Sequence, residues 1–271
     1  MQRLAAATIG LAVETAGETG QLFLHGNSER ELEEAVSTHK LSGIEVQAGN
    51  PQIAYLETLM RPVTIDHFHQ MTAAFPADSA RVVLLFEPQN TGVGNVFTSE
   101  VPPSVMTVTQ LAAIKRGVHS SWRDGPLLGM RVAGMKVTVL EVGIEAGSDP
   151  ERALEIAARM AIKEVSKNGA MRILEPIMSV EVVTPEDFTG SCILDMNSRR
   201  GQILGQSAEP DGNRLSCEAP LGNLFGYAST LRSMTNGRAS CSMTYSHHDL
   251  MPNNIAPDDP QNFPPAIGMR A

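Results

Sequence analysis

The succession of elements between residues 173 and 248 constrains the fold more than any other feature of this chain. Apolar residues largely alternate over Met178–Val183, and this pattern predicts a half-buried strand. Thr184 and Pro185 suit the N-cap and first position of a helix, and Gly201 suits the residue after its last turn. Strands at 201–206 and 214–219, a helix at 220–234 and a strand from 238 to 245 follow. The order β-α-β-β-α-β predicts a ferredoxin-like split βαβ sandwich.

The two helices of this sandwich carry their own face and boundary signals. The first places four residues together: Phe188, Cys192, Ile193 and Met196. The second places four at helical spacing: Leu221, Leu224, Ala228 and Leu231. A turn-rich connection at 207–213 separates the two inner strands, and Asn236-Gly237 ends the second helix.

The first 59 residues show a related but shorter pattern. A strand is expected at Gln21–His25, an acidic helix at Ser28–His39, and two strands near residues 43–49 and 51–59. The opening run, residues 1–14, reads as a helix that precedes an E-T-G turn, with a transit peptide as the alternative because the run contains Arg and is rich in Ala. The order α-β-α-β predicts a ferredoxin-like unit that lacks its first strand.

The middle of the chain predicts a mixed α/β segment. Strands are expected at 61–70, 80–88 and 130–142, the last with a bulge at Gly134, and helices are expected to end near Trp122 and Lys167. Ser148 and Glu151 form a capping box for the second helix. Its predicted buried face consists of Ala153, Leu154, Ala157, Met160, Ala161 and Val165.

Charge is distributed unevenly along the chain. The net charge is −9, which excludes a uniformly basic nucleic-acid binder. Residues 1–59 carry −5, residues 60–173 carry +1, residues 174–248 carry −3 and the remaining tail carries −2. The middle segment is therefore the part of the chain that is not dominated by acidic residues. The Pro/Asn/Asp-rich tail at 253–271 is expected to be disordered.

Residues that could carry chemistry give no catalytic pattern. The cysteines Cys192, Cys217 and Cys241 fall on predicted buried elements and are expected to be reduced core thiols in a reducing compartment. The pairs His67/His69 and His247/His248 are interpreted as solvated strand ends rather than metal ligands. There is no phosphate-binding G-x-x-x-x-G-K-[ST] motif, and no apolar run approaches the roughly 20 residues of a membrane helix.

Long stretches of the sequence resemble elongation factor G, the ribosomal translocation GTPase. Residues 173–203 resemble the start of its last domain, L-L-E-P-[IL]-M-x-[VL]-E-V followed by a helix ending N-x-R-R-G-x-I, and residues 219–252 resemble its P-L-x-E-[MI]-F-G-Y-x-T-x-L-R-S-x-T-x-G-R-A. Residues 48–59 are similar to G-x-P-Q-V-A-Y-R-E-T at the exit of the third domain. Residues 24–33 and 115–129 resemble further motifs of the third and fourth domains.

This resemblance implies the fold and the domain boundaries. The expected class is α+β, with two ferredoxin-like split βαβ sandwiches flanking a ribosomal-protein-S5-like α/β domain. The expected domains are domain III, truncated at its start, at 1–59; domain IV at 60–173; domain V at 174–252; and the tail at 253–271. Domains I and II would be missing. No GTPase activity is therefore expected of this chain, and GTP and Mg²⁺ would bind only to the missing domains.

Departures from the family pattern refine the implied function. The two tip loops of domain IV correspond to residues 71–79 and 142–150, which lack the Gly-rich run and the His and double Ser of translocation factors. These runs are more similar to the mitochondrial ribosome-releasing paralogue, which acts with the ribosome recycling factor. The resemblance thus implies a monomeric ribosome-binding module without membrane partners, in the mitochondrial matrix or alternatively the cytoplasm.

Candidate contacts to ribosomal RNA and protein follow from charge and from these loops. They are Lys115, Arg116, Arg123, Arg131, Ala77, Asp78, Gly147, Ser148, Asp149, Arg199 and Arg200. For each basic residue the alternative is a solvated helix end. Two other functions stay open: an acidic protein-interaction module that has lost RNA binding, and a ribosome-protection factor with the same architecture. A metal-dependent hydrolase built on the histidines is a further alternative.

Overall fold

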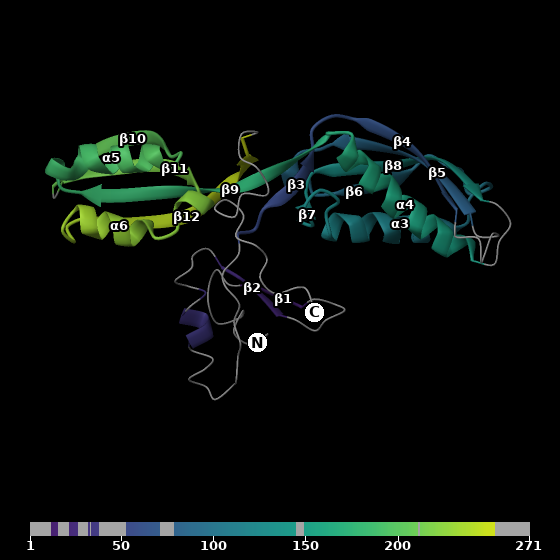
Figure 1. The fold of residues 1–271 in the computed structure, drawn as a ribbon, viewed down its shortest axis with the longest axis horizontal. Helices are drawn as coiled ribbons and strands as arrows, with labels where there is room; N and C mark the ends of the chain where they lie inside the picture. Colours follow the sequence, from purple (N-terminus) through teal and green to yellow (C-terminus); the bar gives the residue numbers. More distant parts are fainter. Residues whose placement is uncertain are drawn as a thin grey trace. The chain divides into compact units, whose positions relative to one another are not determined.

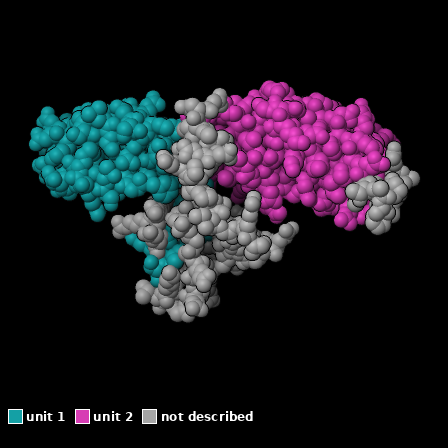
Figure 2. Space-filling view, in the orientation of Figure 1, with its two compact units in different colours: residues 1–53, 176–248, 256–271 teal, residues 54–175, 249–255 magenta. Residues whose placement is uncertain are grey.

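The computed structural model describes residues 12–15, 22–26, 32, 34–37, 53–70, 79–144, 149–210 and 212–252. The chain divides into two compact units (Figure 2). Unit 1 consists of residues 1–53, 176–248 and 256–271, and unit 2 of residues 54–175 and 249–255. Within the described part of the chain, no helix is long and apolar enough to cross a membrane.

Unit 2 is built on a four-stranded sheet with two helices packed on it (Figure 1). Its strands are β4 (Val63–Gln70), β5 (Ser79–Pro88), β6 (Val96–Ser99) and β8 (Met135–Ile144), and its helices are α3 (Val108–Arg123) and α4 (Pro150–Lys167). The strand order is β4-β5-β8-β6, antiparallel except for the parallel pair β6–β8. One apolar core joins the sheet to both helices, with Leu84, Phe86, Ile114, Leu154 and Ile162 at 0% exposure. The central strands are therefore shielded by the α3–α4 layer.

The sequence pattern at 130–142 predicted one strand, but the structure forms two strands in different sheets. The strand β7 (Arg131–Val132) lies parallel to β3 (Leu56–Leu59), whereas β8 belongs to the four-stranded sheet. Gly134 turns the corner between them with φ 68°, and a Cβ there would lie 2.4 Å from the Gln89 carbonyl oxygen. Asn95 clamps the corner, since its amide donates to Val132 O at 2.8 Å and accepts from Met135 N at 3.0 Å. The predicted bulge at Gly134 was wrong. The contacts of Asn95 that hold this corner come from a segment distant in the sequence, so the local pattern at 130–142 does not reveal them.

Unit 1 contains the split βαβ sandwich. Its elements are the C-terminal part of β9 (Met171–Thr184), η2 (Glu186–Phe188), α5 (Thr189–Ser198), β10 (Gln202–Glu209), β11 (Gly212–Pro220), η3 (Leu221–Asn223), α6 (Tyr227–Met234) and β12 (Ser240–Leu250). The strand order is β10-β11-β9-β12, which is the order of a ferredoxin-like sheet. A core that includes Met178, Val180, Met196, Leu215 and Tyr227 joins the sheet to α5 and α6. The α+β class and the split βαβ prediction are confirmed.

Several boundaries in unit 1 differ from the sequence prediction. Thr184 ends β9 instead of capping a helix, because a 3-10 turn precedes α5. The residue of positive φ after α5 is Arg200, at 62°, and not Gly201. Helix α6 begins at Tyr227, which is fully buried, while Ala228 is exposed. The strands β10 and β11 continue to the pair Glu209↔Gly212, so the predicted turn at 207–213 is shorter.

Two more predictions need correction. Helix α4 is capped by Asp149, whose carboxylate accepts from Arg152 N at 3.0 Å, and not by the predicted capping box of Ser148 and Glu151. Met160 is 40% exposed, while Ala158 and Ile162 are buried in its place.

At the start of the chain, β1 (Ala12–Thr15) pairs antiparallel with β2 (Leu22–His25). Residues 12–15 therefore form a strand where the sequence favoured a helix. The strand prediction at 21–25 is confirmed, and residues 34–37 are helical as expected.

The three cysteines are free thiols in the core of unit 1. Cys192 and Cys217 are buried, and Cys241 is half-buried. Burial raises the pKa of all three thiols, that of Cys217 to about 11. The prediction of core thiols is confirmed for Cys192 and Cys217.

Candidate nucleic-acid interface

The strongest concentration of positive charge lies on the two helices of unit 2. Helix α3 begins with a capping box, in which Thr107 Oγ1 accepts from Gln110 N at 3.2 Å and Gln110 Oε1 accepts from Thr107 N at 2.9 Å. Together α3 and α4 carry seven Lys and Arg side chains against three Glu, a net charge of +4 in a chain of net charge −9. These two helices are therefore positively charged, although the chain as a whole is negatively charged.

The basic residues of α3 follow a single stripe. Its members, which we call the α3 stripe, are all exposed: Ala112, Lys115, Arg116, His119 and Arg123. The spacing i, i+3, i+4, i+7, i+11 places these residues on one face, because residues three or four apart are neighbours on a helix. The opposite face is buried and includes Ile114, Val118 and Trp122.

A shallow hollow lies on this stripe, lined by Ala112, Lys115, Arg116 and His119. The imidazole of His119 tilts against the ring of Trp122, with 4.9 Å between ring centroids. Burial and the charge of Lys115 lower the pKa of His119 below its usual value. At neutral pH the hollow therefore has two cationic side chains and one neutral imidazole.

Helix α4 adds a second basic stripe that sequence reasoning missed. Arg152, Arg159 and Lys163 are exposed and recur at i, i+7, i+11, so they share one face of α4, which we call the α4 stripe. Their periodicity is visible in the sequence. However, these three residues are not adjacent to one another in the sequence, so a search for clusters of basic residues does not find them. The sequence around α4 also does not indicate that this helix packs beside α3.

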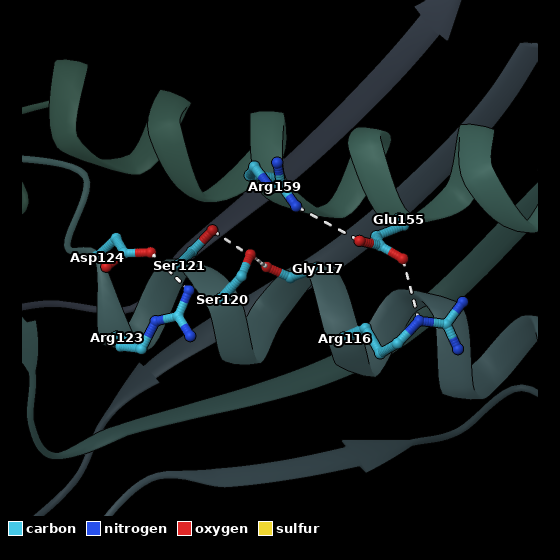
Figure 3. Close-up of polar contacts among 8 residues, drawn as sticks. All are labelled: Arg116, Gly117, Ser120, Ser121, Arg123, Asp124, Glu155 and Arg159. Carbon is cyan, nitrogen blue, oxygen red and sulfur yellow. Dashed lines mark hydrogen bonds and ion pairs between the residues drawn. The ribbon is translucent and has the colours of Figure 1, made fainter. Parts of the chain in front are cut away.

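One carboxylate joins the two stripes. Glu155 of α4 accepts from Arg116 Nε of α3 at 3.0 Å, and Arg159 lies 3.4 Å from its other oxygen (Figure 3). Close approach of the helices makes this contact possible, since a Cβ on Gly117 would lie 2.3 Å from the Glu155 carbonyl oxygen. The hydroxyls of Ser120 and Ser121 donate to Gly117 O at 3.0 and 3.1 Å, which keeps these polar groups within α3 (Figure 3).

The loop after α3 is held by a buried carboxylate. Glu57 of β3 is fully buried and accepts from the backbone N–H groups of Leu127, Leu128 and Met130 at 2.9, 2.7 and 3.0 Å. Burial raises the pKa of Glu57, and these backbone donors act in the opposite direction. Gly125 completes the loop, because a Cβ there would lie 2.0 Å from Met130 O. The loop that leads from Arg123 to β7 is thereby fixed.

The other residues of unit 2 that the sequence predicted as ribosome contacts do not form one cluster. Arg123 contacts Asp124 at 3.2 Å, Arg131 lies exposed on β7, and Asp149 caps α4. Ala77, Asp78, Gly147 and Ser148 lie outside the described residues.

In unit 1, the two predicted arginines behave differently. The guanidinium of Arg199 contacts Asp195 at 2.9 Å and Asn223 O at 2.9 Å, and lies 5.1 Å from the ring centroid of Tyr227. Its side chain is only 18% exposed. Arg200 is exposed. Arg199 thus connects α5 to the segment before α6, which occupies donors that an RNA contact would need.

The histidine pairs show no metal centre. His67 Nδ1 lies 2.7 Å from Glu164 Oε1, and His248 Nδ1 lies 2.6 Å from the Tyr245 hydroxyl. Among the described residues, no group of three or more His, Cys, Asp or Glu side chains could hold a metal ion. The α3 and α4 stripes are therefore the site with the clearest chemical character, a cationic surface suited to phosphate groups.

Comparisons with known proteins place both units in one family. The family model "Elongation factor G, domain IV" matches residues 51–170, and "Elongation factor G C-terminus" matches residues 172–258. Elongation factor G of Paracoccus denitrificans is 38% identical over 257 residues, which cover 94% of this chain and 36% of that protein. The elongation factor G of Cereibacter sphaeroides is 37% identical over 257 residues, which again cover 94% of this chain and 36% of that protein.

A solved structure has a similar fold. A crystal structure of a protein from Thermus thermophilus aligns with a TM-score of 0.66 and 27% identity, covering 90% of this chain and 36% of that chain. The present chain spans about a third of the length of the relatives that it matches. Since the two family models together match most of the sequence, the chain belongs to the elongation factor G family and carries that family's domain IV and C-terminal domain.

Proposed function

We propose that this chain is the ribosome-binding C-terminal module of an elongation factor G-like translation factor. Family membership supports translation as the process. The observation that carries the proposal is the net charge of +4 on α3 and α4, because affinity for a polyanion depends on phosphate-neutralising Lys and Arg side chains. In this proposal, ribosomal proteins hold the acidic remainder of the chain.

Co-sedimentation with ribosomes at two salt concentrations tests this proposal. The wild-type chain is expected to sediment with ribosomes and to dissociate from them as the salt concentration rises. The double variant Lys115→Glu with Arg116→Glu is expected to bind ribosomes more weakly and with a smaller salt dependence. Trp122, the single tryptophan of the chain, reports whether unit 2 of the variant is folded. Equal sedimentation of both proteins would remove the α3 stripe from the interface. No sedimentation of either would favour the acidic protein-interaction module.

We further propose that the parent factor acts in ribosome recycling rather than translocation. The support is the sequence of the two tip loops at 71–79 and 142–150, which lack the His and Ser residues of translocation factors. Recycling requires joint action with the ribosome recycling factor. The chain and that factor should therefore increase each other's retention on ribosomes in the same sedimentation experiment. Retention that is unchanged or competitive would favour translocation or ribosome protection.

A further inference from the structure

The α4 stripe and the α3 stripe form one cationic surface. On α4, Arg152, Arg159 and Lys163 extend over three turns, and Arg116 of α3 reaches across to the same Glu155 carboxylate that Arg159 contacts. Arg116 and Arg159 meet at this carboxylate (Figure 3), so the two stripes lie side by side there and present two rows of cations, roughly 8–10 Å apart, the usual spacing of packed helices. The surface is therefore wide enough to meet more than one row of phosphates.

The donors of this surface are open to solvent. The side chains of Lys115, Arg152 and Lys163 are exposed and have no hydrogen-bond or ion-pair partner among the residues that the structure describes. Of the three guanidinium nitrogens of Arg116, only Nε contacts Glu155, and the two terminal nitrogens point away from that carboxylate (Figure 3). A guanidinium fixed at one edge with its outer donors free suits a phosphate oxygen, because its donors are already oriented.

The far side of the same unit has a different character. Lys136 lies on the sheet face opposite the helices and pairs with Glu87 at 2.7 Å. On β5, Arg81 is shared by Asp66 and Glu141, at 2.6 and 3.0 Å. Each of these two basic side chains is matched by at least one carboxylate, whereas Lys115, Arg152 and Lys163 of the helical layer are open.

The aromatic residues of the two helices argue for a duplex ligand. Single-stranded nucleic acid is bound by exposed aromatic rings on which bases stack. In α3 the ring of Trp122 is only 8% exposed, so the imidazole of His119, which tilts against it, is the one exposed ring of the two helices, and α4 contains no aromatic residue. Protein interfaces likewise depend on aromatic anchors, so an acidic protein partner is disfavoured. Double-stranded RNA is recognised through its backbone and shape, which needs cations but no stacking.

We propose that the α3 and α4 stripes bind the phosphate backbone of double-stranded RNA without sequence preference. This inference rests on the proposed ribosome-binding function and names the ligand class of its cationic surface. The α4 residues Arg152 and Lys163 are new contacts in this proposal. Glu155 is a positioning residue that holds Arg116 and Arg159.

Fluorescence anisotropy with a labelled RNA duplex of about 16 base pairs tests the surface, using the full chain. Arg152→Glu with Lys163→Glu is expected to weaken binding by about tenfold or more and to reduce the salt slope by about 2, one for each lost phosphate contact. The matched control is Lys136→Glu with Arg232→Glu, which changes the net charge equally but lies outside the two stripes. The control is expected to bind as wild type does. Trp122 fluorescence verifies the fold of unit 2 in all three proteins.

The possible outcomes separate this inference from the proposed function. Equal duplex binding by wild type and the stripe variant, or equal weakening in the control, would overturn the assignment of the surface. Tighter binding of a single-stranded RNA of the same length, or equal competition by polyglutamate, would overturn the ligand class. If wild type sediments with ribosomes but does not bind the duplex, this inference fails while ribosome binding stands. If wild type binds the duplex but not ribosomes, the proposed function fails.

Discussion

At the scale of single residues, Arg200 and Gly201 end α5 through two different constraints. The backbone N–H of Gly201 donates to Met196 O at 2.9 Å, and that of Arg200 donates to Asn197 O at 3.1 Å, which is the hydrogen-bond pattern of a Schellman motif. Arg200 supplies the left-handed conformation, with φ 62°. Gly201 is required for a steric reason, since a Cβ there would lie 2.6 Å from Met196 Cγ and 2.8 Å from Met196 O.

Gly201→Val should destabilise unit 1 by roughly 1–3 kcal/mol, the usual cost of overpacking a filled core. The added methyl groups meet Met196, which is 1% exposed and cannot move outward freely. Urea unfolding followed by circular dichroism measures the change. Gly205→Val is the matched control, because no atom lies within 4 Å of a Cβ at that position in the exposed strand β10. An unchanged midpoint for Gly201→Val would show that the helix end tolerates a side chain.

The buried thiols predict a loss of stability at high pH. Burial raises the pKa of Cys217 to about 11, whereas an unfolded thiol titrates near its ordinary value of about 8.5. The folded state therefore keeps a proton that the unfolded state releases, and the stability of unit 1 falls as pH rises between these two values. Cys217→Ala should show a smaller drop in urea midpoint between about pH 8 and about pH 10 than wild type does. Parallel pH profiles for the two proteins would contradict the role of this thiol.

At the scale of elements, the crossing of α3 and α4 depends on a residue without a side chain. Gly117 lies against the backbone of α4, and a Cβ there would approach Glu155 O at 2.3 Å and Ala158 Cβ at 3.1 Å. Both helices also bury several alanines, including Ala113 on α3 and Ala157 and Ala161 on α4. Small residues let the two helices pack closely, and this closeness brings Arg116 within reach of Glu155.

Gly117→Ala should separate the two helices and destabilise unit 2 by roughly 1–3 kcal/mol. The expected loss exceeds the gain of up to about 1 kcal/mol that Ala normally brings to a helix interior. Trp122 fluorescence during urea unfolding measures it. Gly190→Ala in α5 is the control with the same chemistry, since nothing lies within 4 Å of the position its new methyl group would take, and it should be neutral or stabilising. A stabilised Gly117→Ala variant would mean that the helices adjust without cost.

At the scale of the whole molecule, the chain passes from unit 2 to unit 1 along β9 and returns after β12. Residues 249–252 belong to unit 2, where Met251 is 5% exposed. Its N–H donates to Ile173 O at 3.0 Å, and its carbonyl accepts from Arg172 at 2.6 Å. Unit 2 is therefore completed by residues that follow unit 1 in the sequence.

For this reason, two truncated chains should differ sharply in the stability of unit 2. Deletion of residues 253–271 should leave the Trp122 unfolding midpoint nearly unchanged. Deletion of residues 249–271 also removes the buried Met251 and its two hydrogen bonds, and should cost roughly 2–4 kcal/mol in unit 2. Equal midpoints for the two truncated chains would show that Met251 contributes no stability.

The isolated chain should neither bind nor hydrolyse GTP. The physical reason is that the sequence contains no Gly-rich loop whose backbone N–H groups and Lys could hold the phosphates. Calorimetric titration with GTP and Mg²⁺ should give no binding heat. A micromolar dissociation constant would contradict this expectation.

The sequence by itself determined the features that depend on neighbouring residues. Alternation and helical periodicity indicated the β-α-β-β-α-β order of the C-terminal sandwich, the end of α4 at Lys167 and the burial of Cys192 and Cys217. Long ungapped motifs indicated the family, which the comparisons then showed. Periodicity and end signals are local, because they arise from the repeat of one element and the capping of its ends.

Only the tertiary structure decided the features that depend on distant segments. Arg116 and Glu155 are 39 residues apart, and Glu57 meets Leu127 across 70 residues. The corner at Gly134, the inward position of Arg199 and the pairing of the two basic stripes likewise depend on which element lies alongside. A sequence pattern states that a side chain is exposed or buried, but the neighbour that it meets is set by packing, which is why half of the cationic surface was not predicted.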